Sequence, residues 1–195
     1  MCYIGIPTRM VSKVAHVRGG LSALAIVFAV AGVAAQAPQG KGLQVVPVVR
    51  GDHLNVTAEL RDGLTSDVRA AIDSGLKTIF TYTIDLRLDV PGWIDRTIAT
   101  AVITNSVEYN NLDQRYTLES RVDGKDLKPE ITKDALRVRQ WMTRLEALPL
   151  FSTRILQPNR EYYVRVSATA RPSYGSILWP FGSGTSAQTK FVFLR

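Results

Sequence analysis

Few side chains in this sequence have the types and spacing that catalysis or metal binding requires. Beyond residue 35 the chain contains one histidine, His53, and no cysteine, because Cys2 is the only cysteine. Common zinc sites are built from several Cys and His ligands, and a Ser-His-Asp triad would need His53 as its base. The sequence contains no G-x-S-x-G motif to present a serine nucleophile. The pattern therefore predicts no metal, no cofactor and no serine-type hydrolysis.

Paired carboxylates are the remaining source of catalysis that the sequence leaves open. Such a pair performs acid-base chemistry when the two groups flank a substrate. No spacing brings two acidic residues together, and solvated surface carboxylates explain the pattern equally well. A carboxylate-dependent hydrolase is therefore an alternative to a protein without catalytic residues, and its candidate groups are Asp95, Glu108, Asp113 and Glu119.

Residues 1–35 have the layout of a secretory signal peptide. Three basic residues and no acidic residue precede Leu21–Ala35, an apolar run of 15 residues. Val33 and Ala35 occupy the −3 and −1 positions of a cleavage site before Gln36. The run is shorter than the roughly 20 apolar residues of a membrane span. We expect export to the periplasm or envelope, with an uncleaved N-terminal anchor as the alternative.

The charge of the expected exported part is modest. The leader holds three of the 24 basic residues and none of the 17 acidic residues, which leaves a net charge of +4 for the rest. Together with the expected compartment, this value argues against nucleic-acid binding. Attraction to anionic lipid head groups stays open.

The remaining chain reads as one β-rich domain. Residues 36–42 form a polar spacer, and residues 43–195 are enough for one buried core without disulfides. Even positions of Thr78–Val90 are mostly apolar and odd positions mostly polar, which predicts a long antiparallel strand with one wet face. Further strands are expected at residues 43–49, 53–60, 97–109, 115–122, 125–127, 161–171 and 189–194.

Two helices are expected between the strands. Thr65 is a natural N-cap for residues 65–74, and Gly75 suits the left-handed position that ends a helix. A second helix is expected over residues 133–147, capped by Thr132 and closed by Pro149. The predicted fold is α+β and mostly β: an antiparallel β-sandwich or curled sheet with two short covering helices.

Two segments are candidates for an interaction surface. Lys133, Arg137 and Arg144 fall on one stripe of the expected second helix, where they are solvated or face phosphates, lipid head groups or an acidic partner. The loop at residues 177–182 contains Leu178, Trp179 and Phe181, which either plug the end of the sandwich or form an exposed patch.

A set of short segments is specific in combination, although each is weak alone. These are Gly63-Leu64-Thr65, Val68-Arg69, residues 71–76, Phe80-Thr81-Tyr82, Trp93-Ile94-Asp95-Arg96, residues 109–112, residues 115–118, Pro149-Leu150-Phe151, residues 158–165 and residues 179–182. Together they resemble a bacterial family called domain of unknown function 4390, over roughly residues 43–195. The resemblance implies an exported protein, and the family has no established activity or catalytic residue to transfer.

The sequence thus favours a non-enzymatic envelope domain that binds an envelope or membrane protein, with membrane-surface contact also open. The first alternative is a carrier of a small ligand or lipid, held between the sheet and the helices. The carboxylate-dependent hydrolase is the second alternative.

Overall fold

Alternating apolar and polar residues build the centre of a large antiparallel sheet. In β3 (Thr78–Leu88) the even positions, among them Phe80, Tyr82 and Ile84, are buried and the odd positions lie on the other face. This alternation confirms the strand expected from the sequence. The structure is a computed structural model, and it describes residues 42–172 and 184–194.

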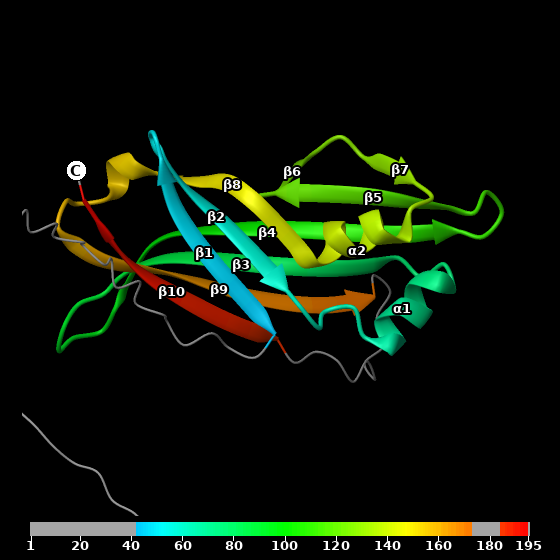
Figure 1. The fold of residues 1–195 in the computed structure, drawn as a ribbon, viewed down its shortest axis with the longest axis horizontal. Coiled ribbons are helices and arrows are strands. Elements are labelled where there is room, and N and C mark those ends of the chain that lie inside the picture. The colour runs from blue at the N-terminus through cyan, green and yellow to red at the C-terminus, as the bar shows by residue number, and fades with distance from the viewer. Residues whose placement is uncertain (1–41, 173–183, 195) are drawn as a thin grey trace, which may run out of the picture. The chain divides into compact units, whose positions relative to one another are not determined.

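The larger sheet has antiparallel strands throughout and curls around one side of the core (Figure 1). Its neighbouring strands, in order, are β10 (Thr185–Phe193), β9 (Arg160–Pro172), β3, β4 (Arg96–Asn110), β5 (Arg115–Val122) and β6 (Lys125–Asp126), with β7 (Glu130–Thr132) also paired to β5. Asp123 and Gly124 join β5 to β6 with φ values of 48° and 79°. Positive φ at both positions is the signature of a type I′ turn, as the Asp-Gly pair predicts.

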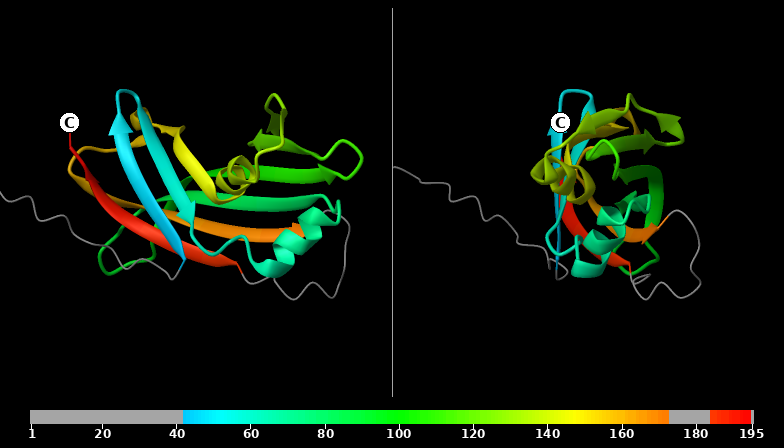
Figure 2. Two further views of the ribbon diagram at one scale, coloured as in Figure 1. Left: turned by 45° about the vertical axis from the view of Figure 1, so that its right-hand side comes forward. Right: turned by 90° about the vertical axis from the view of Figure 1, so that its right-hand side faces the viewer.

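A smaller sheet covers the concave face of the larger one (Figure 2). It pairs β1 (Leu43–Arg50), β2 (His53–Leu60) and β8 (Arg144–Ser152), all antiparallel. The Thr189 hydroxyl donates to the Val45 carbonyl over 2.7 Å, which links β10 to β1 at one side of the two sheets. Apolar side chains from both sheets and both helices form one buried cluster between them.

Helix α1 (Ser66–Asp73) forms as the sequence predicts. The Thr65 hydroxyl accepts a hydrogen bond from the Val68 amide, and Gly75 has a φ of 84°. These are the N-cap and the left-handed C-terminal residue that typically bound a helix. Val68 and Ile72 turn inward and join the core.

Helix α2 (Ala135–Thr143) is shorter than predicted, and both of its expected boundaries are wrong. Asp134, not Thr132, is the N-cap, because its carboxylate accepts from the Leu136 amide over 2.8 Å. The Thr132 hydroxyl instead accepts from the Asp134 amide, just before the helix begins. The chain leaves the helix at Arg144 and continues directly as β8, so Pro149 lies within a strand and does not close the helix.

Side chains of the larger sheet fix the C-terminal end of α2. The Tyr82 hydroxyl donates to the Met142 carbonyl over 2.5 Å, and the Asn105 amide donates to the Trp141 carbonyl over 2.8 Å. Ser120 orients Asn105 by donating to its side-chain oxygen over 2.7 Å. Carbonyl groups in the last helical turn lack partners within the helix, so these bonds supply the missing hydrogen-bond donors. Burial raises the pKa of Tyr82, which keeps its hydroxyl a donor.

Strand β8 was not expected, because its leucines and Pro149 resemble a helix that ends at a proline. It is an edge strand of the smaller sheet, and edge strands tolerate proline. Its pairing with β2 is interrupted at Ala147, which has a φ of 42°. Asn55 donates to the Ala147 carbonyl and Thr57 accepts from its amide, each over 3.1 Å. Side chains of β2 therefore hold the irregularity in place.

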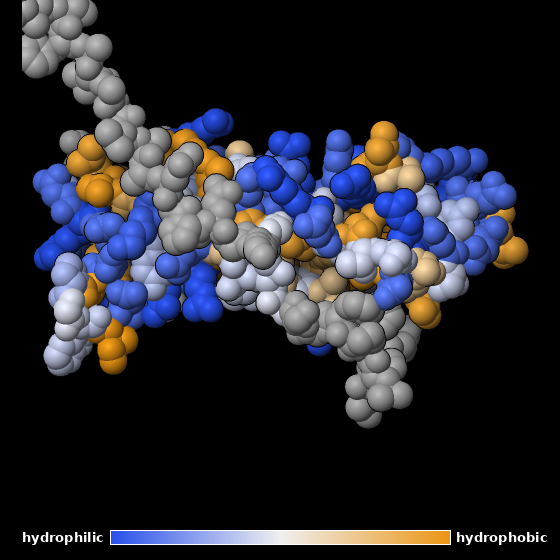
Figure 3. Space-filling model, turned by 60° about the horizontal axis from the view of Figure 1, so that its bottom comes forward, coloured by the Kyte–Doolittle hydropathy of each residue, from blue (hydrophilic) through white to orange (hydrophobic). Residues whose placement is uncertain are grey.

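The fold is α+β and mostly β, as predicted, with two α-helices and antiparallel sheets among the described residues. A short 3-10 turn, Thr153–Ile155, follows β8. Large apolar side chains remain on the surface, and Figure 3 shows one face on which they lie between hydrophilic neighbours. No described helix combines the length and the apolar character that crossing a membrane requires.

The bond from Tyr82 to α2 leads to a stability prediction. Tyr82→Phe leaves the buried Met142 carbonyl without a donor and should lower the free energy of unfolding by about 1–3 kcal/mol. Urea unfolding followed by tryptophan fluorescence measures this difference. Tyr116→Phe is the matched control, since the Tyr116 hydroxyl has no hydrogen bond among the described residues. It should change stability by less than about 0.5 kcal/mol, and equal losses in both variants would contradict the assigned role of the bond.

Candidate functional site

Helix α2 separates two hollows on the surface of the described domain. Successive residues of a helix are rotated by about 100°, so Arg137, Gln140 and Trp141 share one side while Ala135 and Arg139 share the opposite side. The first group lines one hollow and the second group lines the other. Val138 and Met142 point between these directions into the core. The helix therefore forms a ridge with a depression on each flank.

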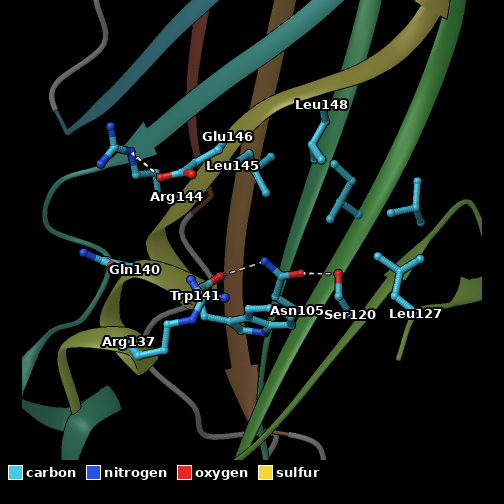
Figure 4. A pocket seen from close by; sticks show the side chains of 12 residues that line it. Asn105, Ser120, Leu127, Arg137, Gln140, Trp141, Arg144, Leu145, Glu146 and Leu148 are labelled. Atoms are coloured by element: carbon cyan, nitrogen blue, oxygen red, sulfur yellow. Dashed lines mark hydrogen bonds and ion pairs between the residues drawn. The ribbon is translucent and has the colours of Figure 1, made fainter. Parts of the chain in front are cut away.

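The first hollow, called the Trp141 hollow below, has a volume of about 220 Å³. Its walls come from strands β4, β5 and β8, from the segment after β6 and from α2. Figure 4 shows Asn105 on its β4 side, between the Trp141 carbonyl and Ser120. The apolar lining residues are Ile103, Val122, Leu127, Trp141, Leu145 and Leu148.

Ion pairs form the rim of the Trp141 hollow. The Arg137 guanidinium donates two hydrogen bonds of 2.8 Å to the Glu130 carboxylate, and it lies 5.4 Å from the centre of the Trp141 ring. On the β8 side of the hollow, the Arg144 guanidinium lies 3.5 Å from the Glu146 carboxylate. The two-point contact with Arg137 lowers the pKa of Glu130 and raises the pKa of Arg137. The rim is thus polar and locally charge-balanced.

One donor at this hollow has no partner among the described residues. The indole Nε1 of Trp141 is buried and makes no hydrogen bond there. A buried N–H without an acceptor costs about 1–3 kcal/mol relative to a paired one.

The second hollow, called the Arg69 hollow below, lies between α1, α2 and β5 and measures about 290 Å³. Its apolar lining comes from Leu64, Ile72, Tyr116, Ala135, Leu136 and Val138. Arg69 and Arg139 lie on it without an ion pair in the part of the chain that the structure describes, and Asp73 is its one acidic residue. Burial and the Asp73 carboxylate raise the pKa of Tyr116.

Exposed apolar surface accompanies both hollows. Leu136 on α2 is 70% exposed and lines the Arg69 hollow. Leu127 is exposed and lines the Trp141 hollow. An apolar centre with a polar rim is the usual anatomy of a protein interface.

The structure brings together two of the residues that the sequence assigned to a basic stripe. Arg137 and Arg144 line the same hollow, but Arg144 belongs to β8 and Lys133 precedes α2. The predicted helical stripe of three basic residues is therefore wrong, because the helix is shorter than its pattern indicates. Arg137 and Arg144 are both ion-paired. The other candidates, Leu178, Trp179 and Phe181, lie outside the described residues.

Sequence reasoning missed Arg69, Arg139 and both hollows. Arg69 and Arg139 stand on different helices, and no pattern within one helix places them together. The one available signal was Leu136, an apolar residue off the buried stripe of α2. Trp141, an apolar residue of the same helix, is half-buried at a hollow and not in the core.

Of the carboxylates considered for catalysis, Asp95 and Glu119 accept hydrogen bonds from neighbouring side chains, whereas Glu108 and Asp113 are exposed. Glu119 and Asp126 both line a hollow of about 200 Å³ on the outer face of the larger sheet. Hydrogen bonds from Lys77 and Arg121 lower the pKa of Glu119 and of Asp126 respectively. A general acid needs a raised pKa, which is the opposite direction. His53 is exposed at the start of β2, and no group of three metal-ligating side chains occurs among the described residues.

The fold and the two hollows define a mostly β domain with a helical ridge on one side. A family model described as domain of unknown function (DUF4390) matches residues 41–173, and the chain belongs to this family. No curated protein and no solved structure matches the chain.

The ion pair between Glu130 and Arg137 predicts that the stability of the fold depends on pH. The pKa of Glu130 is lowered in the folded state. The ion pair with Arg137 therefore contributes its full stabilisation above the unfolded pKa of about 4.3, and this contribution is lost as the pH falls through the folded pKa. Glu130→Gln should therefore lower stability at pH 7 and lower it less at pH 3.5, measured by urea unfolding. Glu108→Gln, at an exposed carboxylate without an ion pair among the described residues, should change little at either pH. A loss in Glu130→Gln that is equal at both pH values would indicate packing instead of charge.

Proposed function

We propose that this chain is an exported, non-enzymatic envelope domain that binds a partner protein through the α2 surface. This surface comprises the Trp141 hollow, the Arg69 hollow and the exposed Leu136 between them. The observation that carries the proposal is the pair of hollows on opposite flanks of one short helix. A partner that covers α2 would insert side chains on both sides of it.

The sizes of the hollows favour a protein partner over a small molecule. Small-molecule sites typically measure about 300–1,000 Å³ and enclose most of their ligand. Hollows of about 220 and 290 Å³ each suit one or two apolar side chains. Such pockets receive the anchor residues that dominate protein interfaces.

The charges around α2 indicate the chemistry of that partner. Arg137 and Arg144 already have carboxylate partners, so they frame the Trp141 hollow without adding free charge. Arg69 and Arg139 have no such pair in the described ranges. They would attract an acidic group of the partner beside the Arg69 hollow.

The Arg69 hollow supports one alternative, a carrier of a small amphipathic acid. Its volume is close to the lower limit for ligand sites, and it combines an apolar lining with two unpaired guanidinium groups. This alternative predicts a ligand that copurifies with the protein and appears in native mass spectrometry. A purified chain with the mass of protein alone would count against it.

The expected compartment agrees with a binding role. The leader at residues 1–35 has the features of a signal peptide, with an N-terminal anchor as its alternative. Both a cleaved signal peptide and an uncleaved anchor would place the domain among proteins of the envelope. The partner would accordingly be an envelope or membrane protein.

Site-specific crosslinking in living cells tests the proposal. A photoreactive amino acid replaces Leu136 in the tagged full-length chain, and the same replacement at Leu112 serves as the control. Leu112 is 93% exposed in the turn between β4 and β5 and lines neither hollow. We expect one dominant protein adduct from position 136 and none of that mass from position 112.

Charge reversal gives the second arm of this experiment. Arg139→Glu should reduce the adduct yield from position 136, because the acidic group of the partner would be repelled. Equal adducts from both positions, or a yield that Arg139→Glu leaves unchanged, would contradict recognition by α2.

A further inference from the structure

The end of the larger sheet that carries the β3–β4 hairpin exposes apolar side chains in a fixed conformation. Residues 89–95 connect the two strands, and Trp93 and Ile94 within them are 80% and 81% exposed. Their side chains are not needed for the core. Exposed apolar residues that lie next to one another are candidates for contact with another surface.

The hairpin conformation is built by a tight turn. The Trp93 amide donates to the Val90 carbonyl over 3.0 Å, and Gly92 between them has a φ of 76°. Proline at the second position and glycine with positive φ at the third are typical of a type II turn, which the sequence Val90-Pro91-Gly92-Trp93 supplies. The turn places Trp93 at the tip.

Asp95 clamps the base of this hairpin to the neighbouring strands. Its carboxylate accepts from the Val90 amide over 3.3 Å and from the Tyr163 hydroxyl over 2.8 Å. Its backbone carbonyl accepts from Arg87 over 3.1 Å, and the Arg87 guanidinium also lies 5.5 Å from the centre of the Tyr163 ring. The bond from Tyr163 lowers the pKa of Asp95. The exposed tip is therefore held by a clamp that involves β3 and β9.

Other strand ends complete this surface. Strands β9, β3 and β4 are neighbours, and the start of β9, the end of β3 and the start of β4 meet at the hairpin (Figure 1). The exposed Arg96 begins β4 opposite Leu88, and the exposed Arg160 begins β9 two residues before Tyr162, which also pairs with Leu88. We call the exposed residues Trp93, Ile94, Arg96 and Arg160 the hairpin-end surface.

The charges of the hairpin-end surface are asymmetric. Asp89 and Glu161 both contact Lys190, and Asp95 is engaged in the clamp. Arg96 and Arg160 are exposed and have no ion pair among the described residues. Apolar tips beside free guanidinium groups are typical of proteins that rest on anionic membranes.

The area of the tip argues for a bilayer and against a second protein. Trp93 offers roughly 200 Å², since an aromatic side chain buries about 150–250 Å², and Ile94 adds a smaller area. A stable protein interface needs about 800 Å² from each partner. A bilayer accepts a single inserted tryptophan at its head-group region without a matching surface. We infer that the hairpin-end surface docks on an anionic lipid bilayer, with Trp93 and Ile94 in the interfacial layer and Arg96 and Arg160 against lipid phosphates.

This contact does not depend on α2, which covers a different part of the sheets (Figure 1). Its test must separate the hairpin from the apolar leader, which by itself would hold the full chain on vesicles. An environment-sensitive fluorophore on a single cysteine reports the surroundings of one position. Cys2→Ser removes the native thiol, and Trp93→Cys or Leu112→Cys introduces the labelling site at either end of the sheet.

The full-length labelled chain is mixed with vesicles of phosphatidylcholine and phosphatidylglycerol in a 3:1 ratio, and with vesicles of phosphatidylcholine alone. At position 93 we expect a blue-shifted emission that spin-labelled lipid quenches, and at position 112 an aqueous spectrum. The effect should require the anionic lipid. A probe that stays aqueous at position 93 while the chain is vesicle-bound would overturn the inference.

Two further substitutions test the side chains in the Cys2→Ser background. With the probe placed at Ile94→Cys, Trp93→Ala should reduce the membrane-inserted fraction about tenfold, because a large apolar anchor is lost. Arg160→Gln should reduce it about fivefold on anionic vesicles and leave it unchanged on neutral ones. A protein adduct as the dominant product of a photoreactive residue at position 93 in cells would also contradict lipid docking.

Discussion

The attachment of the α2 carboxyl end to the larger sheet is the constraint on which the smaller sheet and the candidate site depend. Tyr82 and Asn105 reach from β3 and β4 to two helical carbonyls that have no partner within the helix. Because the chain turns straight from α2 into β8, fixing these carbonyls also fixes where β8 begins. Strand β8 then pairs with β2 and completes the smaller sheet. The Trp141 hollow lies in the space that this turn leaves between α2, β8 and β4.

Local rules of the sequence were sufficient for β3, for the β5–β6 turn and for the start of α1, whereas β7 and the first four residues of β10 were not predicted. The alternation in Thr78–Leu88, the Asp123-Gly124 turn and the Thr65 cap each depend on neighbouring residues, so a short segment contains the information. The second helix and β8 were mistaken for one longer helix for the opposite reason. Residues 144–152 become a strand because β2 supplies a pairing edge and because Asn55 and Thr57 hold Ala147, more than 85 residues away in the sequence.

The candidate site shows the same limit. Arg137 and Arg144 do meet at one hollow, but the predicted helical stripe gave the wrong reason for their proximity. Arg69 and Arg139 come from two helices whose packing no local pattern specifies. For the hairpin tip a signal did exist: Pro91-Gly92 marks a turn, and Trp93-Ile94 directly after it places two apolar residues where a chain reversal points outward. Their exposure becomes evident only in the structure, where other residues of β3 and β4 form the core.

The carboxylates of this domain connect its stability with its surfaces. Glu130 holds Arg137 against the Trp141 ring, and Asp95 holds the hairpin that carries Trp93. Each of these carboxylates thus positions a neighbouring group. Arg139 and Arg96, which lie at the same two surfaces, have no ion pair in the described ranges. Apolar groups on rigid supports lose little conformational entropy on contact, so a small exposed area can contribute more to binding. The hydrogen bonds of these two carboxylates therefore fix the conformation of both surfaces that we propose as contact sites.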